Sequence, residues 1–164
     1  MAYAVPPNTT PEIAFFSQST AESLGTGGTN TLGFDTNRVG NSPIITNNYI
    51  SDTSIFTVNA SGLYQMEGHI SVNPNGATWT NLQKQLYFTI TRGANPATAT
   101  CVQSTQVSSG NFYSIALVAT FPLLQGDQIQ LVHSQSGVTG NPLARGTESG
   151  FDLNTWVSFT FIKA

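Results

Sequence analysis

Histidine, cysteine and acidic side chains could do acid–base, nucleophilic or metal chemistry, but in this chain they are few and scattered. The two histidines are His69 and His133, and the one cysteine is Cys101. His69 follows Glu67 by two residues, yet a metal or acid–base site needs a third converging group, and no spacing supplies one. We expect His69 to be a polar or intersubunit residue, with a ligand or pH-switch role as the alternative.

The other candidates have structural explanations. His133 stands near the end of an expected strand, where we expect it to be exposed. Cys101 lacks the flanking sequence of a nucleophile, and a lone cysteine in a strand usually behaves as a small hydrophobe. Asp127 follows Gly126 in a turn, where aspartate caps its own backbone, and no Asp-rich loop supplies the several oxygens that Ca²⁺ needs. The sequence therefore predicts no enzymatic activity, no metal site and no cofactor.

Aromatic side chains are the better candidates for recognition. Trp156 alternates with apolar residues such as Phe159, and if those face a core, Trp156 faces outward. An outward tryptophan on a strand is either a contact with a neighbouring subunit or a platform for a ligand such as a sugar. Tyr87 raises the same question in its own segment. Trp79 lies in the turn-rich segment 73–81, where an exposed aromatic residue would mark a ligand loop.

Period-two alternation predicts the strands that must position these residues. In residues 56–72, alternate side chains are apolar and polar, which is typical of a strand with one face in a core. The apolar set is Tyr64, Met66, Gly68, Ile70 and Val72, and the polar set is Gln65, Glu67, His69 and Ser71. A turn cluster at 59–62 comes before them, and we expect Gly62 to supply a positive φ there. The segment is thus predicted to be a strand, a tight turn and a second strand, forming a central hairpin.

Other segments follow the same pattern. The longer predicted strands are residues 13–16, 86–91, 98–107, 112–124, 128–133 and 154–163. The polar segment 98–107 is expected at an exposed edge, and brief strands are expected at 32–34 and 44–45. Two Gly-rich segments, 17–31 and 137–151, are expected to be loops. Eight to ten strands without a helix predict a two-sheet sandwich, a barrel or a jelly roll.

Composition supports an all-β fold and excludes several functions. The chain has 22 Thr, 16 Ser, 14 Asn and 10 Gln, whereas only 8% of its residues are charged. Threonine favours strands, and asparagine and serine favour turns. The net charge is −3 and no basic patch exists, so we expect no nucleic-acid partner. No apolar run is long enough to span a membrane. We expect one domain, residues 13–164, after an extended arm, residues 1–12.

Three ordered segments resemble one superfamily. These are FTVNASGLYQMEGHISV at 56–72, LLQGDQIQLVH at 123–133 and the closing TWVSFTFIKA, with AFFSQS near the start as a fitting first strand. They are similar to the strand, turn and closing-strand motifs of the TNF-like and complement globular-head jelly roll. Ser158 departs from that pattern, because a glycine is usual there. The chain also shows neither the collagen-like stalk nor the membrane anchor that secreted complement-type proteins and membrane cytokines have.

The resemblance implies a ten-stranded, two-sheet antiparallel jelly roll that assembles as a homotrimer and has a binding or structural role. It also implies that the sheet containing the closing strand packs around the threefold axis. The trimer-interface candidates are therefore the residues that point out of that sheet, namely Trp156, Ser158, Thr160, Gln65, Glu67 and His69.

Our leading hypothesis from the sequence is a homotrimeric cement or decoration protein on a phage or virus capsid. The first residues do not resemble a secretory signal, and a single cysteine suits a reducing compartment, so we expect synthesis in the host cytoplasm. The partner would be the major capsid protein or another virion protein. One alternative is a receptor- or glycan-binding adhesin such as a head-fibre tip. Another is a secreted or spore-surface TNF-like module outside the cell.

The N-terminal arm is the expected attachment to the particle. Its prolines, including Pro6 and Pro7, disfavour helix and keep the chain extended. At about 3.1 Å per residue, eleven residues could reach roughly 30 Å. Tyr3 and Val5 are apolar residues with no core to join, which suits a groove on another protein. The alternative is an ordinary terminal tail.

Deleting residues 1–11 tests the attachment hypothesis. We expect the truncated protein to keep its oligomeric state and melting temperature, because the arm lies outside the predicted domain, and to lose binding to particles. Co-sedimentation with particles measures attachment, and calorimetry controls for folding. Binding at full occupancy by the truncated protein would show that the arm is only a tail.

Overall fold

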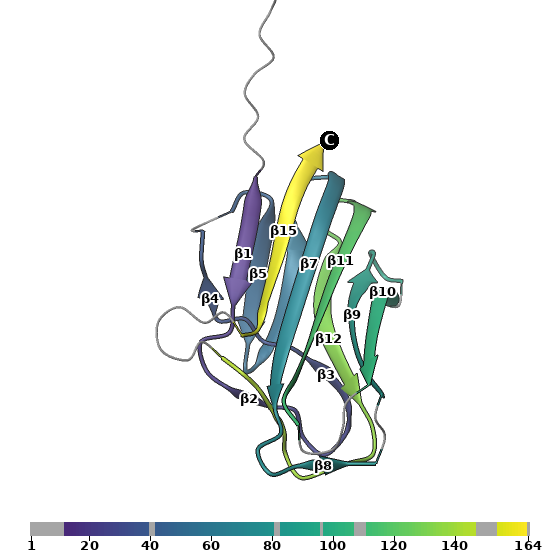
Figure 1. The fold of residues 1–164 in the computed structure, drawn as a ribbon. Helices are drawn as coiled ribbons and strands as arrows, with labels where there is room; N and C mark the ends of the chain where they lie inside the picture. Colours follow the sequence, from purple (N-terminus) through teal and green to yellow (C-terminus); the bar gives the residue numbers. More distant parts are fainter. Residues whose placement is uncertain are drawn as a thin grey trace, which may run out of the picture.

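The computed structural model describes residues 12–39, 42–80, 83–95, 97–106, 111–146 and 154–163. Two antiparallel sheets pack face to face in a jelly-roll sandwich (Figure 1), which confirms the predicted fold class. The described residues form fifteen strands, ten of them with four or more residues, and contain no helix that could cross a membrane. The arm candidates Tyr3, Val5, Pro6 and Pro7, and the side chain of Cys101, lie outside the described part.

The first sheet carries the closing strand at its centre. Its order is β2 (Glu22–Ser23), β14 (Leu143–Ala144), β7 (Gly62–Asn73), β15 (Trp156–Lys163), β1 (Ile13–Ser17) and β4 (Thr36–Asn37), with β11 (Tyr113–Leu123) also paired to β7. β1, β15, β7 and β11 run side by side across the front of Figure 1. Because β7 pairs along most of its length with both β11 and β15, its register determines that of the whole sheet.

The second sheet lies behind the first. Its order is β10 (Thr98–Gln106), β9 (Gln83–Thr91), β12 (Gln128–Gln135), β6 (Thr53–Val58) and β5 (Ile45–Ile50), with β3 (Gly28–Thr31) also paired to β12. A small separate ribbon, β8 (Thr78–Trp79) with β13 (Val138–Thr139), lies at one end of the sandwich. β10 is an edge strand, as expected from its polar sequence.

The turn at residues 59–61 differs from the predicted hairpin. β6 and β7 are not paired, because β6 belongs to the second sheet and β7 to the first. The connection therefore carries the chain across the sandwich and needs none of the positive-φ residues of a tight hairpin. Gly62 accordingly has no positive φ, whereas Gly126 in the adjacent turn has φ 87°. The backbone N–H of Val58 donates to the Asp127 carbonyl at 2.9 Å and ties the two turns together.

The predicted loops and short strands also differ in part. Segment 17–31 contains β2 and β3, and segment 137–151 contains β13 and β14, because both add short strands to the ends of the sheets. Residues 32–34 are not a strand. They are nevertheless buried, and the backbone N–H of Leu32 donates to the Leu131 carbonyl at 2.9 Å.

The inward side of β7 forms the centre of the core, as the alternation predicted. Tyr64, Met66, Ile70 and Val72 are completely buried. Gly68 is required where the sheets approach most closely, because a Cβ atom there would lie 2.9 Å from Cδ1 of Leu131 on β12. The rings of Phe16, Phe34, Phe56 and Phe159 fill the space beside it, with neighbouring centroids 5.0–5.8 Å apart.

Replacing Tyr64 tests this register. Tyr64 is buried, its hydroxyl donates to the Ala60 carbonyl at 2.6 Å, and its ring lies 5.2 Å from that of Phe161. We expect Tyr64→Ala to cost about 3–5 kcal/mol of unfolding free energy, which corresponds to a fall in melting temperature of roughly 6–20 °C. Tyr87→Ala is the matched control, because Tyr87 points out of the second sheet. Equal melting temperatures for the two variants would contradict the assigned register.

Candidate functional site

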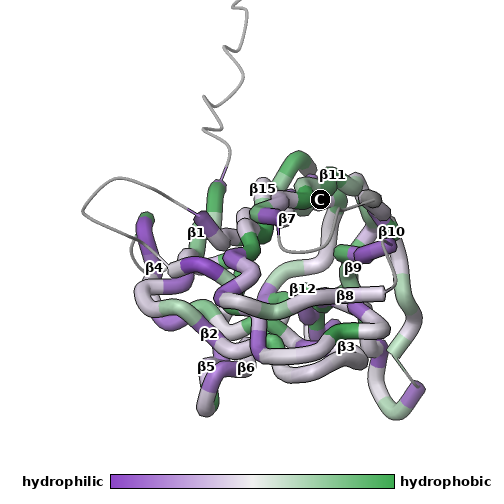
Figure 2. The backbone as a smooth tube through the Cα atoms, turned by 60° about the horizontal axis from the view of Figure 1, so that its bottom comes forward, coloured by the Kyte–Doolittle hydropathy of each residue, from purple (hydrophilic) through white to green (hydrophobic). Residues whose placement is uncertain are grey.

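The candidate site is the outward side of β1, β15, β7 and β11, which we call the open face. Strand pairing aligns its residues in three rows across the sheet. The rows are Ile13–Thr160–Gln65–Thr120, Phe15–Ser158–Glu67–Val118 and Ser17–Trp156–His69–Ala116. The structure therefore brings the six predicted interface candidates together as the two central columns of one surface. Figure 2 shows β15, β7 and β11 side by side along the upper edge, with hydrophobic residues on β11.

Three rings form the rigid part of the open face. The indole of Trp156 stacks on the imidazole of His69, with centroids 5.9 Å apart and planes at 15°. Phe15 meets the other side of the indole edge-on at 5.7 Å. Nδ1 of His69 lies 2.8 Å from the Asn154 carbonyl oxygen, and since a carbonyl can only accept, Nδ1 donates. This bond holds the ring in one orientation and leaves Nε2 for a further partner.

Glu67 is the one carboxylate among the described side chains of the open face, and Nε of Arg38 donates to the Ser17 hydroxyl at the edge of that face at 2.6 Å. Glu67 lies between Ser158 and Val118 across the sheet, and the Gln65 amide donates to its carboxylate at 2.5 Å. Ser158 is only 9% exposed, so it supports its neighbours and offers little contact area itself. Val118 is 60% exposed and Ile13 46% exposed. A wide sheet face with exposed apolar residues and few charged groups is suited to covering by another protein surface.

The residues of the open face do not form a catalytic arrangement. Within the described part of the chain, no serine, threonine or cysteine is hydrogen-bonded to the His69 ring, whose hydrogen-bond partner is the Asn154 backbone carbonyl. No group of three potential metal ligands occurs among the described residues. The aromatic rings, exposed apolar side chains and hydrogen-bonding groups of this face are suited to contact with another surface.

Asp127 is a structural residue. Its carboxylate accepts from Nε and Nη2 of Arg92 at 2.9 and 2.7 Å and from the Leu124 backbone N–H at 2.9 Å. Although partial burial opposes ionisation, the hydrogen bonds from these donors and the Arg92 charge hold the pKa of Asp127 below its ordinary value. Both carboxylate oxygens of Asp127 are thus hydrogen-bonded, and they connect Arg92 at the end of β9 to the turn that contains Gly126.

The prediction that His133 is exposed is wrong. His133 is fully buried, and its Nε2 lies 2.9 Å from the Tyr113 hydroxyl. Burial, assisted by the nearby Lys84 charge, lowers the pKa of His133 to about 3, so its ring is neutral at ordinary pH. Strand alternation could have predicted this burial, because His133 lies on the same side of β12 as the buried Ile129 and Leu131.

The suggestion that Trp79 marks an exposed ligand loop is also wrong. Trp79 is only 4% exposed, because the β8–β13 ribbon folds it over Tyr113, with ring centroids 5.9 Å apart. Nζ of Lys84 lies 5.3 Å from the centre of the indole, on its face, and donates to the Ser136 carbonyl at 3.3 Å. Burial lowers the pKa of Lys84. The sequence analysis did not predict this buried cluster. Strand alternation could have predicted the burial of Lys84, because Lys84 lies on the same side of β9 as the buried Leu86.

Glu22 on β2 is another group that the sequence did not single out. Its Oε2 accepts from the Gln18 amide at 2.6 Å and from the Gly33 backbone N–H at 3.2 Å. Desolvation raises the pKa of Glu22 to about 7, with a further contribution from the nearby Asp52 charge. Glu22 is thus an unfavourably buried carboxylate at neutral pH.

The comparisons with known proteins identify the fold. No protein-family model and no curated protein sequence matches the chain. Among solved structures, murine APRIL at pH 5.0 matches with a TM-score of 0.61 and 11% identity, over 93% of this chain and 100% of that chain. Eiger TNF from S. frugiperda matches with a TM-score of 0.63 and 13% identity, over 93% and 92% of the two chains. At such low identity these likenesses show that the chain has the TNF-like jelly-roll fold, as the resemblance implied.

Removing the charge of Glu22 tests its burial. In the folded state Glu22 binds its proton more tightly than in the unfolded chain, where its pKa is near 4.5, so its contribution to stability falls as pH rises from about 4.5 to about 7. We expect Glu22→Gln to stabilise the protein by ~1–3 kcal/mol at pH 8 and to have much less effect at pH 4.5. Urea unfolding at both pH values measures this, with Glu12→Gln as an exposed control. A stability difference independent of pH would contradict the assignment.

Proposed function

We propose that the chain is a homotrimeric structural or binding module that associates through the open face and has no enzymatic activity. The observation that carries this proposal is the alignment of Phe15, Trp156 and His69 on one surface with the exposed Val118. A closed cyclic assembly would bury this surface on every subunit. Likeness in fold to murine APRIL and to Eiger TNF supports the proposal only through the shared architecture.

Electrostatics favours self-association of this face. The Glu67 carboxylate already accepts a hydrogen bond from the Gln65 amide. This bond lowers the desolvation free energy that must be spent when another surface covers the carboxylate. Nε2 of His69 is available for a partner, since Nδ1 is held by the Asn154 carbonyl. The chain as a whole has few charges, so copies would repel one another little.

The finer role that we propose is decoration of a phage or virus capsid, with the trimer on the outer surface and the arm at residues 1–12 reaching the capsid protein. The low charged fraction and the proline-punctuated arm support this role. A receptor-binding fibre tip is less well supported than it was from the sequence, because the buried Trp79 removes the aromatic marker of a ligand loop.

Light scattering on the purified protein tests the assembly. We expect about three times the 17.4 kDa chain mass at micromolar concentration. Val118→Lys should give a monomer, because trimer formation would bury a lysine, whereas in the monomer the lysine lies beside Glu67. Val39→Lys is the matched control, since Val39 is 56% exposed and lies off the open face. Circular dichroism checks that both variants fold.

Two results would contradict the proposal. One is a wild-type protein that stays monomeric, because the open face would then not be an interface between subunits. The other is a Val118→Lys variant that remains trimeric, which would place the interface elsewhere on the molecule.

A further inference from the structure

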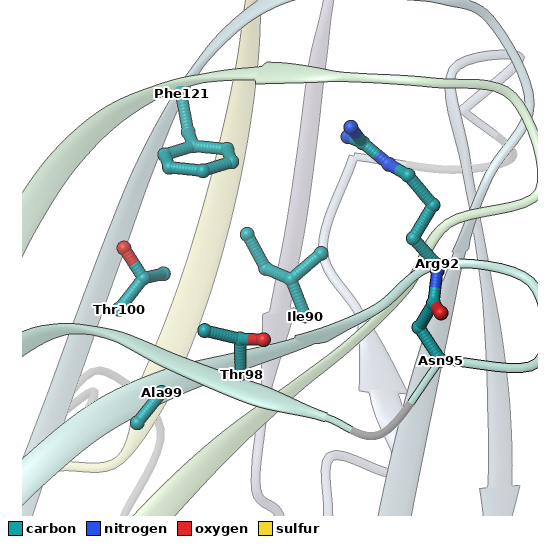
Figure 3. Close-up of a pocket in the computed structure, with 7 residues that line it drawn as sticks. All are labelled: Ile90, Arg92, Asn95, Thr98, Ala99, Thr100 and Phe121. Atoms are coloured by element: carbon teal, nitrogen blue, oxygen red, sulfur yellow. The ribbon is translucent and has the colours of Figure 1, made fainter.

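One corner of the sandwich is open where the β9–β10 hairpin faces the end of β11. Residues that point inward there are not fully covered. Thr98 is exposed, and Thr100 and Phe121 are half-buried, whereas Ile115 and Leu117 farther along β11 are buried. Between them lies a cavity of about 460 Å³, within the size range of small-molecule sites. Figure 3 shows Phe121 projecting from β11 toward Ile90, Thr98 and Thr100 on the opposite sheet.

The opening follows from the strand order. β10 and β11 are each the last strand of their sheet on this side, and they are not paired with one another. Small inward-facing side chains such as Thr98, Thr100 and Ala119 do not reach across the gap. The walls are therefore the Phe121 ring and the nearly buried Ile90, which is 7% exposed.

The rim of the cavity has hydrogen-bonding groups but no net charge. Arg92 lies beside Ile90, and its Nε and Nη2 are bound by the Asp127 carboxylate, so the pair is neutral as a whole. Nη1 of Arg92 donates no hydrogen bond within the described residues and remains available. The Asn95 side chain lies near the main-chain end of Arg92 and adds an amide to the rim, and the two threonines add hydroxyl groups.

This combination selects a ligand class. An anion would gain little from a guanidinium whose charge is already compensated. A purely apolar ligand would remove water from the Thr98 and Thr100 hydroxyls without replacing their hydrogen bonds. A neutral sugar ring carries no charge and can replace the lost hydrogen bonds to water. It offers an apolar face to an aromatic ring, and its hydroxyl or amide groups bind donors and acceptors.

We propose that this crevice binds a neutral sugar residue, a hexose or an N-acetylhexosamine. The apolar face of the ring packs on Phe121, and its oxygens bind Nη1 of Arg92, the Asn95 amide and the hydroxyls of Thr98 and Thr100. The crevice is separate from the open face, so this inference does not rest on trimer formation or on a capsid role.

Titration of the full ¹⁵N-labelled chain, followed by NMR, tests the proposal. The probes are galactose, glucose, mannose, N-acetylglucosamine and N-acetylgalactosamine, with hexanoate and cyclohexanol as anionic and apolar comparisons. We expect at least one neutral sugar to shift the amide signals of residues 90–95 and 97–100 and of Phe121. Thr98→Phe, which fills the cavity, should abolish the shifts. Asn95→Ala should weaken binding roughly three- to tenfold through one lost hydrogen bond, and Thr139→Ala, an exposed threonine on β13, should leave it unchanged.

Three results would overturn the proposal. The first is no shift with any neutral sugar at tens of millimolar. The second is binding of hexanoate or cyclohexanol alone, which would make the crevice a site for another chemistry. The third is sugar binding by the Val118→Lys variant but not by the wild type, which would mean that another copy of the chain covers the crevice in the assembled protein.

Discussion

Close approach of the two sheets over Gly68 is the constraint on which the rest of the structure depends. A side chain at this position would collide with Leu131 and press on Phe88, because both contact the space where its Cβ would lie. The inward side of β7 therefore has one register, with Tyr64, Met66, Ile70 and Val72 in the core. Since strand side chains alternate, the same register directs Gln65, Glu67 and His69 outward. The open face is thus a direct consequence of how the core packs.

The two ends of the first sheet have different consequences. On the β1 and β15 side, the rows of the open face are continuous, and Phe15, Trp156 and His69 contact one another. Beyond β11 the sheet stops, and the sandwich opens over the β9–β10 hairpin. A neighbour-binding surface and a small crevice therefore arise from one architectural feature, a sheet in which β7 and β15 are central and β11 ends one side.

Sequence alternation predicted the fold class, the buried side of β7 and the outward position of the six residues now seen as the centre of the open face. It did not predict which strands pair, because periodicity reports the side to which a residue points but not its partner strand. The supposed hairpin at 56–72 is accordingly a crossover between sheets. His133 follows the parity of a buried strand face although its place near a strand end argued for exposure, and Lys84 is buried on the same side of its strand as Leu86. Burial of such groups depends on partners distant in sequence, such as Tyr113 and Trp79.

The central claim is that the open face is covered in the assembled protein. Hydroxyl-radical footprinting with mass spectrometry measures this directly, by comparing side-chain oxidation in the wild type and in the Val118→Lys variant. If the open face is the interface, Trp156 and Phe15 will be oxidised more slowly in the wild type, while Tyr87 on the opposite sheet will be oxidised equally in both proteins. Equal oxidation of Trp156 in the two proteins, or protection of Tyr87 instead, would contradict the account.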